Sequence, residues 1–247
     1  MFPSRRLFPV VLLLALCACQ PKTADDRRPE TSRDFPVADR PVSRSTDTAF
    51  SSEVQRDSKN EARVVMDLAA IRPGMTVADI GAGEGYYTVR LAQRVGAKGR
   101  VLAEDINAAA NERLGNRVLR EGLENVSIKL GTEDDPSLPP NSFDRIFMVH
   151  MYHEVIEPYA FLWRLRPALR PGGRVIVVDV DRPTDAHGIP PALLFCELNA
   201  VGFRLTEFVR KPELQGYYAQ FEAVGARPAP GDIAPCRVLG GAKADLH

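Results

Sequence analysis

Residues 76–85 read TVADIGAGEG, and this stretch decides the fold. Residues 76–80 are predicted to form a short apolar strand that runs directly into a turn with glycines at positions 81, 83 and 85. The apolar positions that follow, up to Gly96, are spaced for one face of a helix. A strand, a glycine turn and a helix in this order usually receive a ligand at the carboxyl end of the strand. A dinucleotide fingerprint would need a glycine at position 86, where this chain has Tyr86, so that ligand is disfavoured.

The alternation of strands and helices continues along the chain. Apolar runs predict further strands over residues 100–104, 126–130, 143–149 and 174–179. Helical spacing predicts helices over residues 62–69, 88–95, 108–121 and 161–169. Strands that alternate with helices predict an α/β fold with a doubly wound, Rossmann-like, mostly parallel sheet.

The pattern changes after residue 179. Residues 190–201 are predicted to form a helix, because the prolines at its start are tolerated in a first turn. Residues 203–209 and 217–224 then form two strands with no room for a helix between them. Such strands should pair antiparallel, as a C-terminal hairpin.

The composition is that of a globular protein without a dominant charge. The 247 residues include 32 basic and 32 acidic side chains, and 45% are hydrophobic. A balanced charge argues against sequence-independent nucleic-acid binding, which needs surplus Lys and Arg. The length suits one domain with appendages.

The first 19 residues have the layout of an export signal. Two arginines at positions 5 and 6 precede an apolar run, residues 7–18, that is too short to span a bilayer. The run ends in a sequence that resembles a bacterial lipobox, which predicts lipidation of Cys19; placing the modified cysteine at Cys17 fits worse, since bulky Leu16 would precede the cut. The arginine pair also resembles a twin-arginine signal, with ordinary signal-peptide arginines as the alternative.

The remaining chain divides into three parts. Residues 20–52 lack apolar periodicity and are expected to be a flexible linker, residues 53–224 carry the domain, and residues 225–247 are expected to be a loose tail. Cys196 and Cys236 show no metal-binding spacing, and neither a zinc site nor a disulfide framework is expected. Cys196 is interpreted as a small buried hydrophobic residue.

Acidic residues flank the glycine turn. Asp79 lies two positions before the first glycine, and Glu104 and Asp105 close the second predicted strand. A carboxylate at the end of that strand can accept both hydrogen bonds of a ribose diol. The turn and these acids together predict a site for a ligand that contains ribose.

Four segments together resemble the class I S-adenosylmethionine-dependent methyltransferases. They are VADIGAGEGYYTVRLA (residues 77–92), GRVLAEDIN (99–107), NVSIKLGTEDDPSLPPNSFDRIFMVHMYHEV (125–155) and LRPGGRVIVVD (169–179). The likeness covers residues 53–224 and includes bacterial members of lipoprotein type. It implies a seven-stranded sheet with an antiparallel last strand, and S-adenosylmethionine as cofactor.

The resemblance also implies residue roles. The glycines at 81, 83 and 85 would pass under the methionine part of the cofactor, with Asp79 bracing the turn. Asp105, with Glu104 beside it, would bind the ribose. Glu133 and Asp134 would lie near the adenine, although Thr132 stands where many members have an acid.

Candidate catalytic residues follow the fourth strand, in the sequence HMYHE at residues 150–154. Methyl transfer needs a base only when the nucleophile arrives protonated. His150, which would line the cleft, and His153 are the candidate bases, and Tyr152 is a candidate wall of the pocket. Alternatively, His153 and Glu154 orient each other or cap the next helix. No fourth ligand accompanies His150, His153 and Glu154, so no metal is expected.

Two other segments are open to a functional and a structural reading. Arg56, Asp57 and Lys59 either meet the cofactor carboxylate, cover the cleft or are solvated charges. His187 belongs either to a loop over the acceptor or to an ordinary turn.

A small-molecule acceptor is favoured, and a lipid-borne acceptor or a protein side chain stays open as an alternative. No Asn-Pro-Pro-Tyr or Asp-Pro-Pro-Tyr sequence follows the fourth strand, and no nucleic-acid module is appended. An exported protein would meet its cofactor outside the cytoplasm, where that cofactor is not made. Two alternatives therefore stay open: an envelope-anchored binding module without turnover, and a cytoplasmic enzyme.

Overall fold

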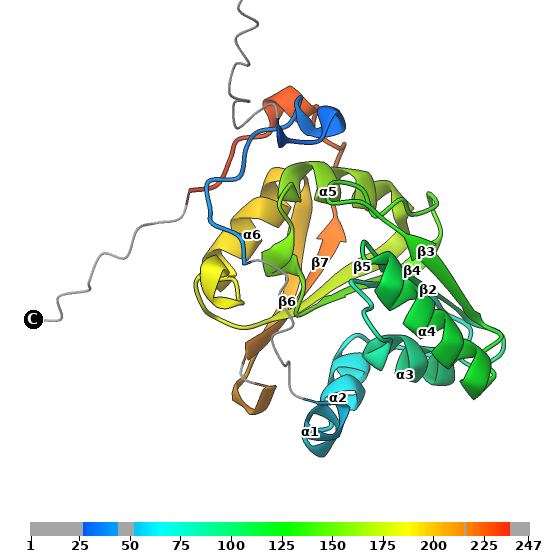
Figure 1. The fold of residues 1–247 in the computed structure, drawn as a ribbon. Coiled ribbons are helices and arrows are strands. Elements are labelled where there is room, and N and C mark those ends of the chain that lie inside the picture. The colour runs from blue at the N-terminus through cyan, green and yellow to red at the C-terminus, as the bar shows by residue number, and fades with distance from the viewer. Residues whose placement is uncertain (1–26, 44–51, 215, 238–247) are drawn as a thin grey trace, which may run out of the picture.

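A computed structural model describes residues 27–43, 52–214 and 216–237, and its centre is one seven-stranded sheet (Figure 1). The strands lie in the order β3-β2-β1-β4-β5-β7-β6. Their bounds are β1 Thr76–Ile80, β2 Arg100–Asp105, β3 Val126–Leu130, β4 Phe143–Val149, β5 Leu169–Asp179, β6 Phe203–Lys211 and β7 Gly216–Ala223. The first five strands pair parallel, and β7 pairs antiparallel with both β5 and β6. The predicted α/β fold with a C-terminal hairpin is confirmed.

Six α-helices of the described chain accompany the sheet. They are α1 Glu53–Ser58, α2 Glu61–Leu68, α3 Tyr86–Val95, α4 Ala108–Glu121, α5 Pro158–Leu165 and α6 Pro191–Ala200. Helices α2 and α3 pack on one face of the sheet, and α5 and α6 pack on the other. The central strand β4 serves both layers: Ile146 and Met148 contact the α5 and α6 layer, whereas Phe147 contacts the α2 and α3 layer.

The boundary between α5 and β5 differs from the prediction. The helix was predicted to reach residue 169, but it ends at Leu165 and a 3-10 turn follows over Arg166–Ala168. Pro167 lacks the N–H that a continuing α-helix would use, which accounts for the early end. Strand β5 then begins at Leu169, which pairs with Phe143, rather than at residue 174.

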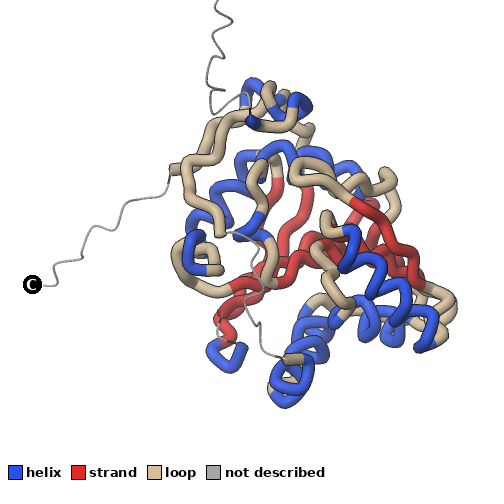
Figure 2. The backbone as a smooth tube through the Cα atoms, in the orientation of Figure 1, coloured by secondary structure: helices blue, strands red, loops and turns tan. Residues whose placement is uncertain are grey.

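Residues 27–43, here called the N-terminal strap, pack against the domain. Together with residues 225–237, here called the C-terminal tail, they run along α5 and α6 (Figure 1). The backbones of Asp39 and Arg237 pair as an isolated parallel β-bridge. Most of both segments is loop rather than helix or strand (Figure 2). Phe35 of the strap is only 6% exposed and meets the Trp163 ring edge-on.

These contacts correct the expectation of a flexible linker over residues 20–52 and of a loose tail over residues 225–247, as far as the described parts of both go. The strap carries few apolar residues, but each of its anchors has a partner on the domain that lies far away in the sequence. Sequence composition alone does not reveal such partners. The expected signal segment, residues 1–19 with Cys19, lies outside the described residues.

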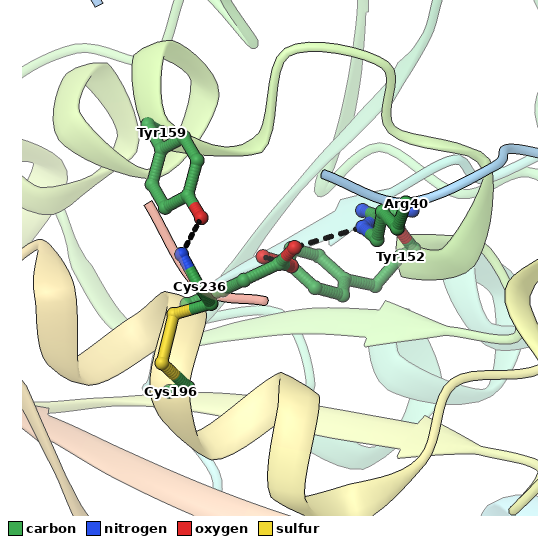
Figure 3. The surroundings of a disulfide bond; sticks show 6 residues. Arg40, Tyr152, Tyr159, Cys196 and Cys236 are labelled. Carbon is green, nitrogen blue, oxygen red and sulfur yellow. Dashed lines mark hydrogen bonds and ion pairs between the residues drawn. A yellow bond between two sulfur atoms is a disulfide. The ribbon is translucent and has the colours of Figure 1, made fainter. Parts of the chain in front are cut away.

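A disulfide joins α6 to the C-terminal tail. Cys196 and Cys236 are bonded, with their Cα atoms 6.0 Å apart (Figure 3). The expectation that no disulfide forms, and that Cys196 is a free buried residue, was therefore wrong. Spacing gave no signal because the bond closes a loop of 40 residues between two irregularly spaced cysteines. Among the described helices, none has both the length and the apolar character needed to cross a membrane.

Candidate active site

The turn after β1 presents an open stretch of backbone. Gly81, Gly83 and Gly85 all have left-handed φ angles, of 66°, 55° and 87°. A Cβ atom on Gly81 would lie 2.9 Å from the Met151 side chain, and one on Gly85 would overlap Leu114, so these two glycines are needed for packing. At Gly83 no atom lies within 4 Å of such a Cβ, which leaves room for a ligand against the backbone.

Two carboxylates hold this turn in place. Asp79 is buried and accepts a hydrogen bond of 2.6 Å from the Thr88 hydroxyl on α3. Burial raises the pKa of Asp79 to about 6. Asp105 accepts hydrogen bonds from the backbone N–H of Gly83 and of Asn107, both 2.8 Å long. Asp105 thus ties the turn to the end of β2, and its oxygens keep lone pairs for further donors.

Glu104 is a buried acid at the carboxyl end of β2. It is 2% exposed, and burial together with the nearby charge of Asp105 raises the pKa of Glu104 to about 8. Its Oε1 atom is buried and has no hydrogen-bond partner among the described residues. A Cβ on Gly131, after β3, would overlap Glu104, so the glycine there makes room for the acid. A buried oxygen acceptor without a donor suits the hydroxyl groups of a ribose.

The loop after β3 separates the two acids expected near an adenine. Glu133 is exposed. Asp134 is buried and accepts hydrogen bonds from Thr31 and Ser32 of the strap, while Arg164 forms an ion pair of 2.8 Å with it. The carboxylate of Asp134 therefore anchors the N-terminal strap, which corrects its expected role in cofactor binding.

His150 lies directly after β4, between the sheet and α2. Its φ angle is 55°, and its backbone N–H donates to Val178 at 2.8 Å. Its Nε2 atom lies 3.6 Å from Oε1 of Glu61, the first residue of α2. The side chain of His150 therefore faces the same layer as the glycine turn and α3.

Glu61 is a functional candidate that the sequence did not reveal. Its Oε1 atom also accepts hydrogen bonds from Arg56 at 2.5 Å and from the Tyr87 hydroxyl at 3.2 Å. Burial alone would raise its pKa, but hydrogen bonds from His150 and Arg56 outweigh burial and lower the pKa of Glu61 to about 2. Glu61 is thus an anion that links His150 to α1 and α3.

Arg56 and Asp57 lie on α1 and Lys59 caps its C-terminus, and of these three charges Arg56 is the one that pairs with Glu61. Its guanidinium lies 3.8 Å from the centre of the Tyr86 ring, and only 15% of its side chain is exposed. Asp57 accepts a hydrogen bond from the Tyr86 hydroxyl and pairs with Arg90. No contact of Lys59 enters this group.

His153 and Glu154 lie on the other side of β4, beside the end of β5. His153 is fully buried, and its Nδ1 atom lies 3.0 Å from both carboxylate oxygens of Asp179. Glu154 Oε1 lies 3.8 Å from His153 Nε2. The contact between His153 and Asp179 follows from the topology, because β4 and β5 are adjacent and their carboxyl ends lie side by side.

Tyr152 does not line a pocket, contrary to the expectation. Its ring is fully buried and its hydroxyl donates to Glu197 on α6 at 2.8 Å. Arg40 of the strap, which lies beside Tyr152 in Figure 3, forms an ion pair of 2.8 Å with the same Glu197. Tyr152 thus belongs to the contact between the strap and the domain.

Known proteins resemble this chain in its central part. Residues 77–173 match a family model described as a methyltransferase domain. The ubiquinone/menaquinone biosynthesis C-methyltransferase UbiE of Hahella chejuensis is 31% identical over 124 residues, which are 50% of each chain. The UbiE of Methylococcus capsulatus is 36% identical over 118 residues, or 47% of this chain and 48% of that one. The chain thus spans about half the length of these curated relatives.

Solved structures resemble more of the chain. A SAM-dependent methyltransferase from Aquifex aeolicus has a TM-score of 0.59 at 27% identity, covering 65% of this chain and 87% of that one. The [4+2]-cyclase SpnF has a TM-score of 0.57 at 19% identity, covering 72% of this chain and 69% of that one, which is a likeness of fold alone.

Proposed function

We propose that the chain is a class I S-adenosylmethionine-dependent methyltransferase and that it transfers a methyl group from this cofactor to a small-molecule acceptor. The match of residues 77–173 to a methyltransferase domain and the likeness to a solved SAM-dependent methyltransferase support this proposal. The observation that carries the proposal is the pairing of two features at adjacent strand ends. Gly83 leaves its backbone open, and Glu104 holds a buried oxygen without a hydrogen-bond donor. In a ligand with a ribose and a compact charged group, the ribose hydroxyls would donate to Glu104 and the charged group would lie against the backbone at Gly83.

The residues around the turn fit this cofactor. Gly81, Gly83 and Gly85 would face its methionine part, and Glu104 and Asp105 its ribose. Glu133 is the acid of the β3 loop that remains exposed for the adenine. When bound, S-adenosylmethionine supplies a methyl group on a positively charged sulfur. The protein's task is to orient the acceptor behind that methyl group and to exclude water.

His150 is the side chain best placed to take a proton from an acceptor. It follows β4, adjacent to β1 and its glycine turn, and Glu61 holds its Nε2 side. Glu61, whose carboxylate lies 3.6 Å from Nε2, would orient the ring and leave Nδ1 as the nitrogen that takes the proton. This role is needed only for an acceptor that arrives with its proton.

Calorimetry with S-adenosylhomocysteine on the detergent-solubilised full-length protein tests cofactor binding. Asp105→Ala should weaken binding by about 1–3 kcal/mol, because the lost hydrogen bonds involve a carboxylate. Asp144→Ala is the matched control. Asp144 also accepts a backbone N–H, from Thr76, but it lies at the opposite edge of the sheet. Failure of the wild-type protein to bind either S-adenosylmethionine or S-adenosylhomocysteine would overturn the proposal.

A small molecule is the proposed acceptor class. The curated relatives are named as C-methyltransferases of quinone biosynthesis, which makes quinone precursors the first compounds to test. Envelope extracts incubated with methyl-labelled cofactor should yield label in the organic-soluble fraction. Label confined to protein would refute a small-molecule acceptor.

A binding module without turnover is the second candidate function. The same fold occurs in a protein named as a [4+2]-cyclase, so the fold by itself does not fix the reaction. Tight binding of S-adenosylhomocysteine with no labelled product from any extract fraction would favour this candidate.

We further propose that the protein is exported and anchored in the bacterial envelope through Cys19. The Cys196–Cys236 disulfide supports an oxidising compartment, since such bonds are rare in the cytoplasm. Metabolic labelling with palmitate should mark the wild-type protein and not a Cys19→Ser variant. Recovery of unlabelled protein in the cytoplasmic fraction, with Cys196 and Cys236 reduced, would refute the proposal.

A further inference from the structure

Three potential metal ligands meet at the carboxyl ends of β4 and β5. His153 and Glu154 lie in the turn after β4, and His187 lies in the loop after β5. One ligand atom from each residue lies within 4.8 Å of the other two. The set comes from two segments more than 30 residues apart, so it is formed by the fold and not by local sequence spacing.

His153 is oriented as a ligand by Asp179. A carboxylate only accepts hydrogen bonds, so the proton of a neutral His153 ring lies on Nδ1, which faces both Asp179 oxygens at 3.0 Å. Asp179 is itself fixed, since its Oδ1 accepts the backbone N–H of Val180 at 2.8 Å. The Nε2 lone pair then points to the side of Glu154, and a carboxylate behind a histidine in this way is the usual second partner of a metal-bound imidazole.

The spacing of His153 Nε2 and Glu154 Oε1 suits a shared cation. The two atoms lie 3.8 Å apart. Neighbouring ligand atoms of a tetrahedral zinc site lie about 3.3 Å apart, given bonds of about 2.0 Å. Two atoms that both carry lone pairs repel unless a proton or a metal ion lies between them, and a small contraction would bring this pair to bonding distance of an ion.

His187 completes the set from a strained loop position. Its φ angle is 55°, which is unfavourable for a residue with a side chain. Its Nδ1 atom is buried and has no hydrogen-bond partner among the described residues. Ser43 of the strap holds this loop by accepting the His187 N–H at 3.0 Å and donating to the Thr184 carbonyl at 2.5 Å.

We propose that His153, Glu154 and His187 bind a divalent transition-metal ion of the zinc class, with Asp179 orienting His153. Two imidazole nitrogens and one carboxylate leave a fourth position open, as in metal sites that bind a further ligand. Strand β5 lies two strands from β1, or about 10 Å from the glycine turn. An oxygen or nitrogen of the methyl acceptor could occupy that fourth position; this part rests on the proposed function, whereas the metal site does not.

Metal titration of the untagged full-length protein tests the site. Co²⁺ should bind with one equivalent per chain and give the visible absorption of a four-coordinate ion, and Zn²⁺ should displace it. His187→Gln should weaken Co²⁺ binding at least tenfold. Asp179→Asn should weaken it by about 10–100-fold, because the carboxylate that orients His153 is lost. His150→Gln is the matched control, because His150 also follows β4 but its side chain lies beside Glu61 and outside the set. This variant should leave Co²⁺ binding unchanged.

Two outcomes would overturn the inference: no stoichiometric Co²⁺ binding, or equal affinity in the wild-type protein and His187→Gln. His187 lies in a loop, so its variant should fold, and thermal unfolding followed by circular dichroism checks this. Binding of S-adenosylhomocysteine is measured in parallel. Cofactor binding without metal binding would refute the metal site alone. Metal binding without cofactor binding would refute the methyltransferase function alone.

Discussion

The two halves of the sheet's carboxyl edge are built in different ways. On the β1 and β2 side, the glycine turn, Asp79 and Asp105 lie within one strand–turn–helix–strand unit and hold one another through local hydrogen bonds. On the β4 and β5 side, His153 meets Asp179 and His187, and the strap and tail close over α5 and α6. The first side can be interpreted from a motif, whereas the second exists only once distant segments have packed.

The proposed cofactor site therefore depends on local contacts, whereas the β4 and β5 side depends on contacts between distant segments. Changes to the strap and tail should affect the stability of the second side and leave cofactor binding largely intact. Changes to the turn should do the reverse. The following predictions test this division.

The largest expected effect comes from the buried ion pair between the strap and α6. Arg40 and Glu197 have side chains that are 0% and 1% exposed. Arg40→Ala would leave Glu197 without its cation, at a cost of about 3–5 kcal/mol in the free energy of unfolding measured with urea. Arg63→Ala, in an exposed pair with Asp67, is the control and should cost under about 1 kcal/mol. Equal losses would mean that the strap is not a structural part of the domain.

Removing the disulfide should have the next largest effect. A Cys196→Ser and Cys236→Ser double variant should lose about 2–4 kcal/mol of unfolding free energy, because the unfolded chain regains the freedom of a long loop. Reduction of the wild-type protein should give a similar loss, and the reductant should not alter the double variant. Affinity for S-adenosylhomocysteine should stay the same in both, and a parallel loss of affinity would contradict the division of the two sides.

Cofactor affinity should depend on pH through Glu104. Its pKa of about 8 means that the acid is mostly protonated at pH 6. Ribose hydroxyls donate to the ionised form, so affinity for S-adenosylhomocysteine should rise with pH, by up to about tenfold per unit, and level off above about pH 8. Without ligand, the same raised pKa lowers the free energy of unfolding as pH rises from about 5 to about 8, because the folded state holds the proton more tightly.

Glu104→Gln should flatten both pH profiles, and calorimetry between pH 6 and pH 9 measures the first of them. A wild-type profile that is flat, or that falls with pH, would remove Glu104 from the ribose site.

The smallest expected effect separates backbone strain from ligand contact at Gly83. Gly83 and Gly122 have similar φ angles, 55° and 64°, and both have open space where a Cβ would be. Alanine at either position should cost about 1–2 kcal/mol of stability. Only Gly83→Ala should also weaken S-adenosylhomocysteine binding, because Gly122 ends α4 away from the turn. Equal affinities in the two variants would place the ligand elsewhere.

Local signals account for the parts of the fold that were predicted correctly. Strands β1, β3 and β4 and helix α4 have the predicted bounds, because apolar runs, glycine stops and the Asn107 cap are written in adjacent residues. The start of β5 was missed because a single proline, Pro167, ended the helix before its apolar pattern ended.

Contacts between distant segments account for what was missed. Nothing near Arg40 in the sequence indicates a partner at Glu197, and nothing near Asp134 indicates that Thr31 and Ser32 occupy it. Glu61 looks like an ordinary acid in the first turn of a helix until the fold brings His150 beside it. His153 and Glu154 were recognised, but their third partner, His187, depends on where the loop after β5 returns.

If Cys19 carries the proposed lipid, the packing of the strap limits how far the folded domain can lie from that lipid. Residues 27–43 are fixed to the domain, so residue 19 is only eight Cα steps from it, at most about 30 Å even when fully extended. A flexible tether that reached to residue 52 would let the domain move much further from the membrane surface. With the short tether, the domain would stay within about one molecular diameter of the bilayer, where apolar compounds concentrate.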